Sequence, residues 1–134
     1  MERQKKVVDA SIGVKWFSPE EDTPKSRELL KNHIEKKIKI IVPDLFFYEV
    51  LNALRFNKNS EKYLKKVALD LESFELEIIN VSLPLLEKSV ENSVKYNLTI
   101  YDAVYLTIAK EFNNKLISAD KKILSSNKNL VEGL

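Results

Sequence analysis

The chain has 134 residues, of which 44% are hydrophobic and 31% are charged, and this size and balance predict one globular domain over residues 1–134. Its 22 basic and 20 acidic residues give a formal charge of +2, which does not by itself indicate a nucleic-acid or membrane partner. The lack of cysteine, the presence of only two glycines and the single histidine, His33, exclude thiolate chemistry, glycine-rich phosphate loops and paired-histidine metal sites within one chain. Along the chain, no apolar stretch is long enough for a signal sequence or a membrane span, so we expect a cytoplasmic protein without membrane contacts.

Short β-branched runs alternate with stretches of helical periodicity along the chain. In chain order, the pattern predicts a strand at residues 6–10, a helix at 23–37, a strand at 40–42, a helix at 45–56, a helix from a cap at Ser60 to Phe74, a strand at 77–81, a helix from 84 to about 97, a helix at 99–113, a strand at 116–118, a helix at 120–126 and a last strand at 129–131. Because strands alternate with helices, we expect an α/β fold in which right-handed crossovers build a central, mainly parallel sheet between two helical layers. Chemistry in such sheets gathers beyond the carboxyl ends of the strands.

Several helices carry additional signals of their position. Asp44 lies where a cap belongs, and the helix at residues 45–56 that follows it is apolar nearly all round, which predicts burial on more than one side. In the helix at residues 23–37, Ile34 belongs to the apolar spacing, whereas His33 has polar neighbours and is expected at the surface.

Three aspartates lie at the ends of elements, next to apolar segments. Asp9 ends the first strand, and Asp120 follows the strand at residues 116–118, so either side chain could cap the turn or helix that comes next. Asp102 lies in the first turn of a helix, where Thr99 to Asp102 resembles a capping box. For each aspartate taken alone, a structural role and a functional role both remain open.

Glu49 is harder to explain by structure alone. Its neighbours on the helix are apolar, and a buried carboxylate without a partner is costly. The structural alternative is a polar seam in which Glu49 bonds to Asn52 and reaches solvent at the helix edge. No basic residue lies three or four positions away, and Arg55, at six positions, is roughly 120° around the helix. The sequence therefore favours a functional role for Glu49.

Taken together, the four acids could converge on one cleft. Asp9 and Asp120 lie at strand ends, and Glu49 and Asp102 lie in the N-terminal halves of helices that could start from the same edge. Carboxylates packed closely repel one another unless a cation neutralises them. A site made only of oxygen ligands suits Mg²⁺ or Mn²⁺, which are shared with substrate phosphates, so the reaction that fits best is phosphodiester hydrolysis.

Specific motifs accompany these acids in a fixed order. They are VVDAS at residues 7–11, KWF at 15–17, VPDL at 42–45, EVLNAL at 49–54, LTIYDA at 98–103, YL at 105–106 and LISADK at 116–121. In this order and spacing, the chain resembles the PIN-domain ribonucleases and, within them, the compact VapC-like toxins of type II toxin–antitoxin pairs. The resemblance covers nearly the whole chain.

The resemblance implies which residues form the site. The catalytic and metal-binding acids of the family fall on Asp9, Glu49, Asp102 and Asp120, and the family's hydroxyl residue two positions before the last acid falls on Ser118, where threonine is common. Ser11 and Asn52 match positions that support the site without ligating the metal.

The resemblance also implies an activity and partners. A protein of this kind is a three-layer α/β/α endoribonuclease in which Mg²⁺ or Mn²⁺ activates water to attack an RNA phosphodiester. It is commonly a homodimer, and a cognate antitoxin keeps it inactive by laying its C-terminal segment along the catalytic groove. Two alternatives stay open: a PIN-type RNA-processing nuclease without an antitoxin, and a catalytically inactive PIN-like binding module, against which the intact set of acids argues. A phosphoacceptor-aspartate regulator is less similar, because it would need adjacent acids after the first strand.

Overall fold

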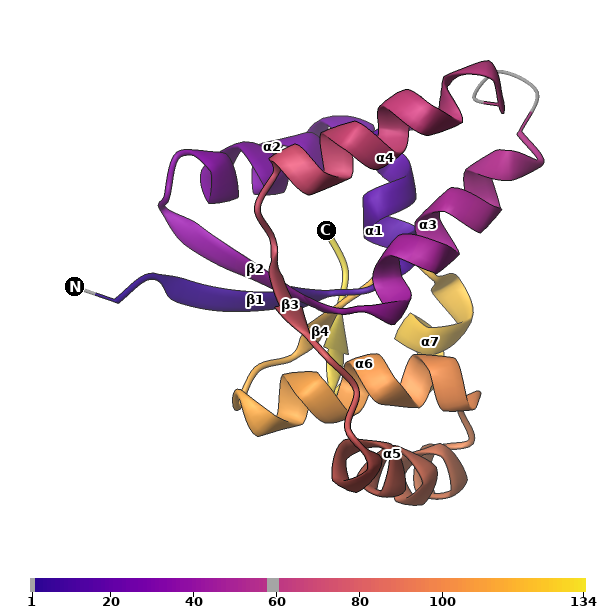
Figure 1. Ribbon diagram of the computed structural model, residues 1–134. Helices are drawn as coiled ribbons and strands as arrows, with labels where there is room; N and C mark the ends of the chain where they lie inside the picture. Colours follow the sequence, from indigo (N-terminus) through magenta and orange to yellow (C-terminus); the bar gives the residue numbers. More distant parts are fainter. Residues whose placement is uncertain (1, 58–60) are drawn as a thin grey trace.

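The computed structural model of the chain describes residues 2–57 and 61–134, and Figure 1 shows the arrangement of the elements. In chain order, these are β1 (Gln4–Val8), α1 (Ala10–Lys15), α2 (Thr23–Ile34), β2 (Ile38–Pro43), α3 (Leu45–Arg55), the 3₁₀ turn η1 (Glu61–Tyr63), α4 (Leu64–Ser73), β3 (Glu77–Ile79), α5 (Leu83–Tyr96), α6 (Ile100–Glu111), β4 (Leu116–Ile117), α7 (Lys121–Ser126) and β5 (Val131–Glu132). None of the helices in the described part of the chain is long and apolar enough to cross a membrane.

The five strands form one parallel sheet in the order β3-β2-β1-β4-β5. The first strand lies at its centre, where Val7 pairs with Ile41 of β2 on one side and with Leu116 of β4 on the other. Parallel strands need crossover connections, and the alternation of strands and helices along the sequence supplies them. The predicted α/β fold with a parallel sheet is therefore confirmed.

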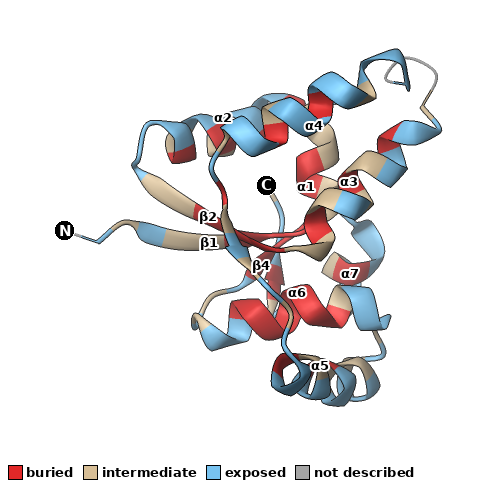
Figure 2. Cartoon of the chain, viewed as in Figure 1, coloured by how far each residue is buried: buried red, intermediate tan, exposed pale blue. Residues whose placement is uncertain are grey.

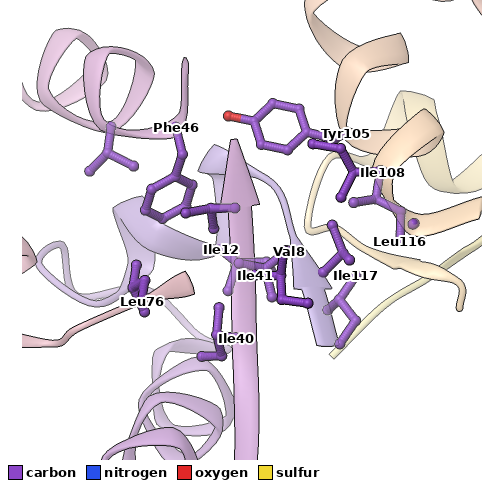
Figure 3. Packing of buried hydrophobic residues seen from close by; sticks show 14 of the residues in the cluster. Val8, Ile12, Ile40, Ile41, Phe46, Leu76, Tyr105, Ile108, Leu116 and Ile117 are labelled. Atoms are coloured by element: carbon purple, nitrogen blue, oxygen red, sulfur yellow. The ribbon is translucent and has the colours of Figure 1, made fainter. Parts of the chain in front are cut away.

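Helices cover both faces of this sheet. In Figure 1, α1 to α4 lie on one side and α5 and α6 on the other, and in Figure 2 the buried residues gather on the central strands and on the helix faces turned toward them. Figure 3 shows the two halves of the core, with Ile12 and Phe46 on one side of the strands and Tyr105 and Ile108 on the other. The three-layer α/β/α arrangement predicted from the sequence is confirmed.

The short helix α1 was not expected from the sequence. It is only six residues long and contains Gly13, a weak helix former, so its periodicity gives little signal. Gly13 is required by packing, because a Cβ at this position would come within 2.5 Å of the Phe46 ring and 2.9 Å of Val50 on α3. Helices α1 and α3 therefore pack closely, and Asp9 lies directly before α1.

Helix α3 corrects the expectation of burial on several sides. Only Phe46, Val50 and Leu54, which recur every four residues, are buried, and Tyr48 is 76% exposed. Leu45, Phe47 and Leu51 are only partly buried at the edge of the core, and the Tyr48 side of the helix faces solvent. One face of α3 is therefore a surface rather than core.

The positions of His33 and Ile34 are exchanged relative to the sequence prediction. His33 is buried, with 4% of its surface exposed, whereas Ile34 is exposed. The buried face of α2 runs through Ser26, Leu30 and His33. The two polar residues can be buried there because the Ser26 hydroxyl and the His33 ring both hydrogen-bond to backbone groups. The cap predicted at Ser60 lies outside the described residues, and the predicted end of α5 near Asn97 is confirmed by the left-handed conformation of that residue.

Candidate active site

The candidate acids lie along the edge of the sheet where the parallel strands end. Asp9 directly follows β1, and Asp120 follows β4 by three residues and begins α7. Glu49 lies in the second turn of α3, which begins directly after β2, and Asp102 lies in the first turn of α6. Four separate segments of the chain therefore deliver one carboxylate each to the same edge.

Asp9 is held firmly at the end of β1. Its side chain caps α1 by accepting a hydrogen bond from the Ser11 backbone N–H at 3.0 Å, and it also accepts one from the Ser11 hydroxyl. Its own backbone N–H donates to the Ile117 carbonyl at 3.1 Å, which continues the pairing of β1 with β4. Only 4% of Asp9 is exposed. The cap that the sequence allowed as an alternative is present, and the carboxylate is buried as well.

The two hydroxyl residues Ser11 and Ser118 connect this aspartate to the other side of the site. The Ser11 hydroxyl accepts a hydrogen bond from the Ala119 N–H at 2.8 Å, and the Ser118 hydroxyl accepts one from the Asp120 N–H at 3.0 Å. The two hydroxyl oxygens are 3.4 Å apart. Ser11 thus joins α1 to the loop between β4 and α7, next to Ser118, and the supporting role of both residues stays a prediction.

Asp102 and Asp120 also take part in helix capping. The Asp120 side chain accepts from the backbone N–H groups of Lys122 at 2.9 Å and Ile123 at 3.4 Å. The Thr99 hydroxyl accepts from the Asp102 N–H at 3.1 Å, so the predicted cap at the start of α6 is present. Capping by Asp120 uses its carboxylate, whereas the cap at the start of α6 uses the Asp102 backbone N–H.

Glu49 bonds to a different residue from the one that the polar-seam alternative proposed. Its Oε1 accepts a hydrogen bond of 2.6 Å from the Tyr105 hydroxyl of α6, and Asn52 is exposed on the outer face of α3. Tyr105 is 1% exposed, and in Figure 3 its hydroxyl oxygen points away from Ile108 and Leu116. This interaction joins the helical layers across the end of the sheet.

Tyr105 is the site residue that sequence analysis missed. Its ring packs in the hydrophobic core, as expected for an aromatic residue within an apolar helix. The signal that could have revealed it is its spacing, because residues three apart on a helix are neighbours and Tyr105 is three residues after Asp102. Its hydroxyl then lies on the same side of α6 as that carboxylate.

The carboxyl groups of Asp9, Glu49 and Asp102 have raised pKa values. Burial raises the pKa of Asp9 to about 6, and the nearby Asp102 carboxylate adds to this rise, although the Ser11 and Ser118 hydroxyls oppose it. Burial and Asp102 also raise the pKa of Glu49, against the hydrogen bond from Tyr105. Burial and Asp120 raise the pKa of Asp102, and the hydrogen bond with Thr99 and the charge of Lys122 oppose this rise. Asp102 is therefore the common electrostatic neighbour of the other three acids.

The same edge places negative charge around the Tyr105 hydroxyl. Burial, the hydrogen bond to Glu49 and the charges of Glu49, Asp9 and Asp102 all raise the pKa of Tyr105. The phenol therefore stays protonated and acts as a hydrogen-bond donor to Glu49.

These donors suit a hard divalent cation in chemical type. Carboxylate and hydroxyl oxygens are the ligands that Mg²⁺ and Mn²⁺ prefer, and a cation would offset the burial and the nearby Asp102 charge that raise the pKa of Asp9. In the part of the chain that the structure describes, no three histidine, aspartate or glutamate side chains form a group that could hold a metal ion. The structure thus brings the four acids into electrostatic range of Asp102, and their role as metal ligands stays a prediction.

The chain is similar to known proteins over nearly its whole length. The family profile of the PIN domain matches residues 6–128. A toxin–antitoxin complex from Klebsiella pneumoniae contains a chain of 20% identity and TM-score 0.67, with 95% of each chain covered. The VapC20 toxin of Mycobacterium tuberculosis, described as cleaving the sarcin–ricin loop, is 14% identical with TM-score 0.73, covering 94% of this chain and 96% of the toxin.

A third structure has a similar degree of likeness. It is VapBC2 from Rickettsia felis bound to a DNA fragment from its promoter, 19% identical with TM-score 0.66, covering 98% of this chain and 99% of that chain. No curated protein sequence matches the chain. At these identities, the structural likeness establishes a shared fold.

Proposed function

The chain belongs to the PIN-domain family, and from this premise we propose that it is a divalent-metal-dependent endoribonuclease, the toxin of a type II toxin–antitoxin pair. The observation that carries the proposal is the state of Asp9. This carboxylate is almost fully buried, lies beside another carboxylate and has its pKa raised to about 6. A protein keeps such a costly arrangement when the charge serves a function.

The residues along the sheet edge divide into ligands and residues that position them. Asp9, Glu49, Asp102 and Asp120 would hold Mg²⁺ or Mn²⁺. When bound, this ion would lower the pKa of a water molecule and stabilise the negative charge that develops on the phosphate. The protein supplies a rigid frame for these carboxylates, because each one comes from the start of a helix or the end of a strand.

The positioning residues act on three of the proposed ligands. Hydrogen bonds from Ser11 fix the carboxylate of Asp9, and Ser118 orients the loop that carries Asp120. The Tyr105 hydroxyl fixes one oxygen of Glu49 and leaves the other available. This division of labour, in which neighbouring donors set the orientation of ligating carboxylates, is typical of metal sites in proteins.

The partners of the chain are part of the same proposal. Two of the similar structures carry names that describe a toxin–antitoxin complex or its VapB and VapC components, which supports a cognate antitoxin as a partner of this chain. We infer in addition an RNA substrate, a homodimer and a cytoplasmic location. That residues 1–134 form a single PIN-like domain stays a prediction of the same kind.

The test is cleavage of a mixed RNA pool by the purified chain in Mg²⁺ or Mn²⁺ and in EDTA. We expect cleavage that depends on the metal and is lost in Asp9→Asn, which also serves as the control for contaminating nucleases. If the variant cleaves as fast as the parent protein, the activity does not come from this site. If the folded parent protein cleaves no RNA, metal binding decides between the two remaining readings: a chain that binds the metal has a very narrow RNA target, and a chain that binds none is a PIN-like binding module.

A further inference from the structure

A groove beside the acids is lined by α3, α4 and the first turn of α6. Its cavity of about 840 Å³ is in the size range of ligand-binding pockets. The floor is apolar, with Leu45, Leu51 and Leu64 among its residues, and Glu49 and Asn52 line it as well. Because Glu49 belongs both to the candidate active site and to the groove, anything that lies in the groove reaches the acids. We call this surface the α3–α4 groove.

Two exposed tyrosines line the α3–α4 groove. Tyr48 is 76% exposed and Tyr101 is 60% exposed, and they come from different elements, α3 and α6. Each one directly precedes a candidate acid, Glu49 and Asp102 respectively. Core packing does not account for rings that are exposed to this degree. Their rings present flat apolar faces to solvent next to the candidate acids.

Two basic side chains, Arg55 and Lys65, line the same groove. The Arg55 guanidinium forms an ion pair of 2.9 Å with Glu61, in which both side chains are about half exposed. Solvent-exposed pairs of this kind contribute little stability and can be exchanged for another anion at small cost. A phosphate group in the groove could therefore take the place of Glu61.

Exposed aromatic rings beside basic side chains are the combination by which proteins bind single-stranded nucleic acids. We propose that the α3–α4 groove binds unpaired nucleotides of the RNA next to the cleaved bond, with Tyr48 and Tyr101 stacking on bases and Arg55 and Lys65 contacting the sugar–phosphate backbone. The proposal rests on the proposed function in taking RNA as the substrate. The two basic side chains of the groove, Arg55 and Lys65, favour a polyanionic strand over a protein segment as its occupant.

The first experiment measures binding without cleavage. A short single-stranded RNA of mixed sequence is titrated into the protein in EDTA, with its fully base-paired duplex as the comparison. We expect Tyr48→Ala and Tyr101→Ala each to weaken binding of the single strand about tenfold, since stacking on one aromatic side chain contributes on this scale. The variants Tyr48→Phe and Tyr101→Phe keep an aromatic face and should bind like the parent protein. Tyr63→Ala, at an exposed tyrosine outside the groove, is the matched control and should bind normally.

The second experiment measures cleavage kinetics of the same variants. The alanine substitutions should raise KM for single-stranded RNA, and the phenylalanine substitutions should restore it, which a general loss of structure would not produce. Cleavage with unchanged KM in both alanine variants, together with unchanged binding in EDTA, overturns the groove proposal and leaves the proposed nuclease intact. Tyrosine-dependent RNA binding by a chain that cleaves no RNA supports the groove and overturns the nuclease. If the alanine variants bind RNA normally but no longer bind a purified cognate antitoxin, the groove is a protein-binding surface and the proposal is wrong.

Discussion

His33 and Asp9 are equally buried, with 4% of each exposed, yet their surroundings differ in kind. Both ring nitrogens of His33 meet backbone groups: Nδ1 accepts from the Ile40 N–H at 3.0 Å, and Nε2 donates to the Phe74 carbonyl at 2.8 Å. The imidazole is therefore neutral, and each of its ring nitrogens has a hydrogen-bond partner. Asp9, by contrast, carries a charge whose nearest electrostatic influence is another carboxylate, Asp102.

The difference separates a buried polar group that holds the fold together from one that carries chemistry. His33 joins α2, β2 and the end of α4, and its partners are backbone groups that would otherwise lose their hydrogen bonds. Asp9 is satisfied by hydroxyl and N–H donors, but these do not neutralise its charge. A buried group with a raised pKa next to a like charge is a candidate for function, whereas a matched neutral group is not.

The largest effect should come from the electrostatic centre of the acids. Asp102→Asn removes a charge and keeps the size of the side chain, so we expect RNA cleavage to fall to the level seen in EDTA while the fold is retained. The matched control is Asp44→Asn at the start of α3, where the side chain caps the helix by accepting from the Leu45 N–H at 3.0 Å. Cleavage assays and circular dichroism on both variants separate the two roles. Cleavage at the parent rate by a folded Asp102→Asn would remove this residue from the site.

A substitution at His33 should have the opposite profile. His33→Leu leaves the Ile40 N–H and the Phe74 carbonyl buried without partners, and we expect it to lower the free energy of unfolding by about 3 kcal/mol. Urea unfolding measures this loss. Cleavage per folded molecule should be unchanged, because the residue does not contact the acids. A normal stability for His33→Leu would show that these two hydrogen bonds are replaced by other contacts.

Asp9→Asn should stabilise the metal-free protein at neutral pH. Burial raises the pKa of Asp9 from 3.8 to about 6, so between these values the unfolded chain loses the proton first and the free energy of unfolding falls as pH rises. Above pH 6 the buried, ionised carboxylate lowers the free energy of unfolding by on the order of 3 kcal/mol, and below pH 3.8 this destabilisation vanishes. Asparagine carries no such cost.

The measurement is urea unfolding in EDTA at pH 5 and pH 8. The gain in free energy of unfolding of Asp9→Asn over the parent protein should be larger at pH 8. In a separate measurement with saturating Mg²⁺ instead of EDTA, only the parent protein should become more stable. A gain that is the same at both pH values would mean that Asp9 does not titrate in this range, and the contrast with His33 would then be lost.

The fold was largely predictable because its signals are local. Alternating runs of β-branched residues and helical periodicity, with caps such as Asp44 and Thr99, predicted the order of the elements and the parallel sheet. Burial of individual residues was less predictable, as His33 shows, because its partners lie 7 and 41 residues away in the sequence. The polar residues next to His33 in the sequence therefore could not predict its burial, which depends on contacts of α2 with β2 and the end of α4.

The candidate site shows the same division. The four acids could be proposed from their places at strand ends and helix starts, and the structure puts them along one edge of the sheet. The partner of Glu49 could not be chosen in this way, because a local bond to Asn52 and a long-range bond to Tyr105 are both compatible with the sequence. Only the packing of α6 against the end of the sheet decides for Tyr105.

Tyr105→Phe tests whether that long-range bond matters for function or only for structure. The substitution keeps the buried ring and removes the hydroxyl that donates to Glu49, so the free energy of unfolding should change by only about 1 kcal/mol. If Tyr105 positions Glu49 as a metal ligand, metal affinity and kcat should fall by roughly 10–100-fold, the usual effect of losing a residue that orients a ligand. The metal concentration at half-maximal cleavage reports the first quantity, and single-turnover cleavage at saturating metal reports the second. A parallel loss in Glu49→Gln, with no further loss in the double variant, would show that both residues act through the same hydrogen bond, and independent losses would show that the Tyr105 hydroxyl serves the site in another way.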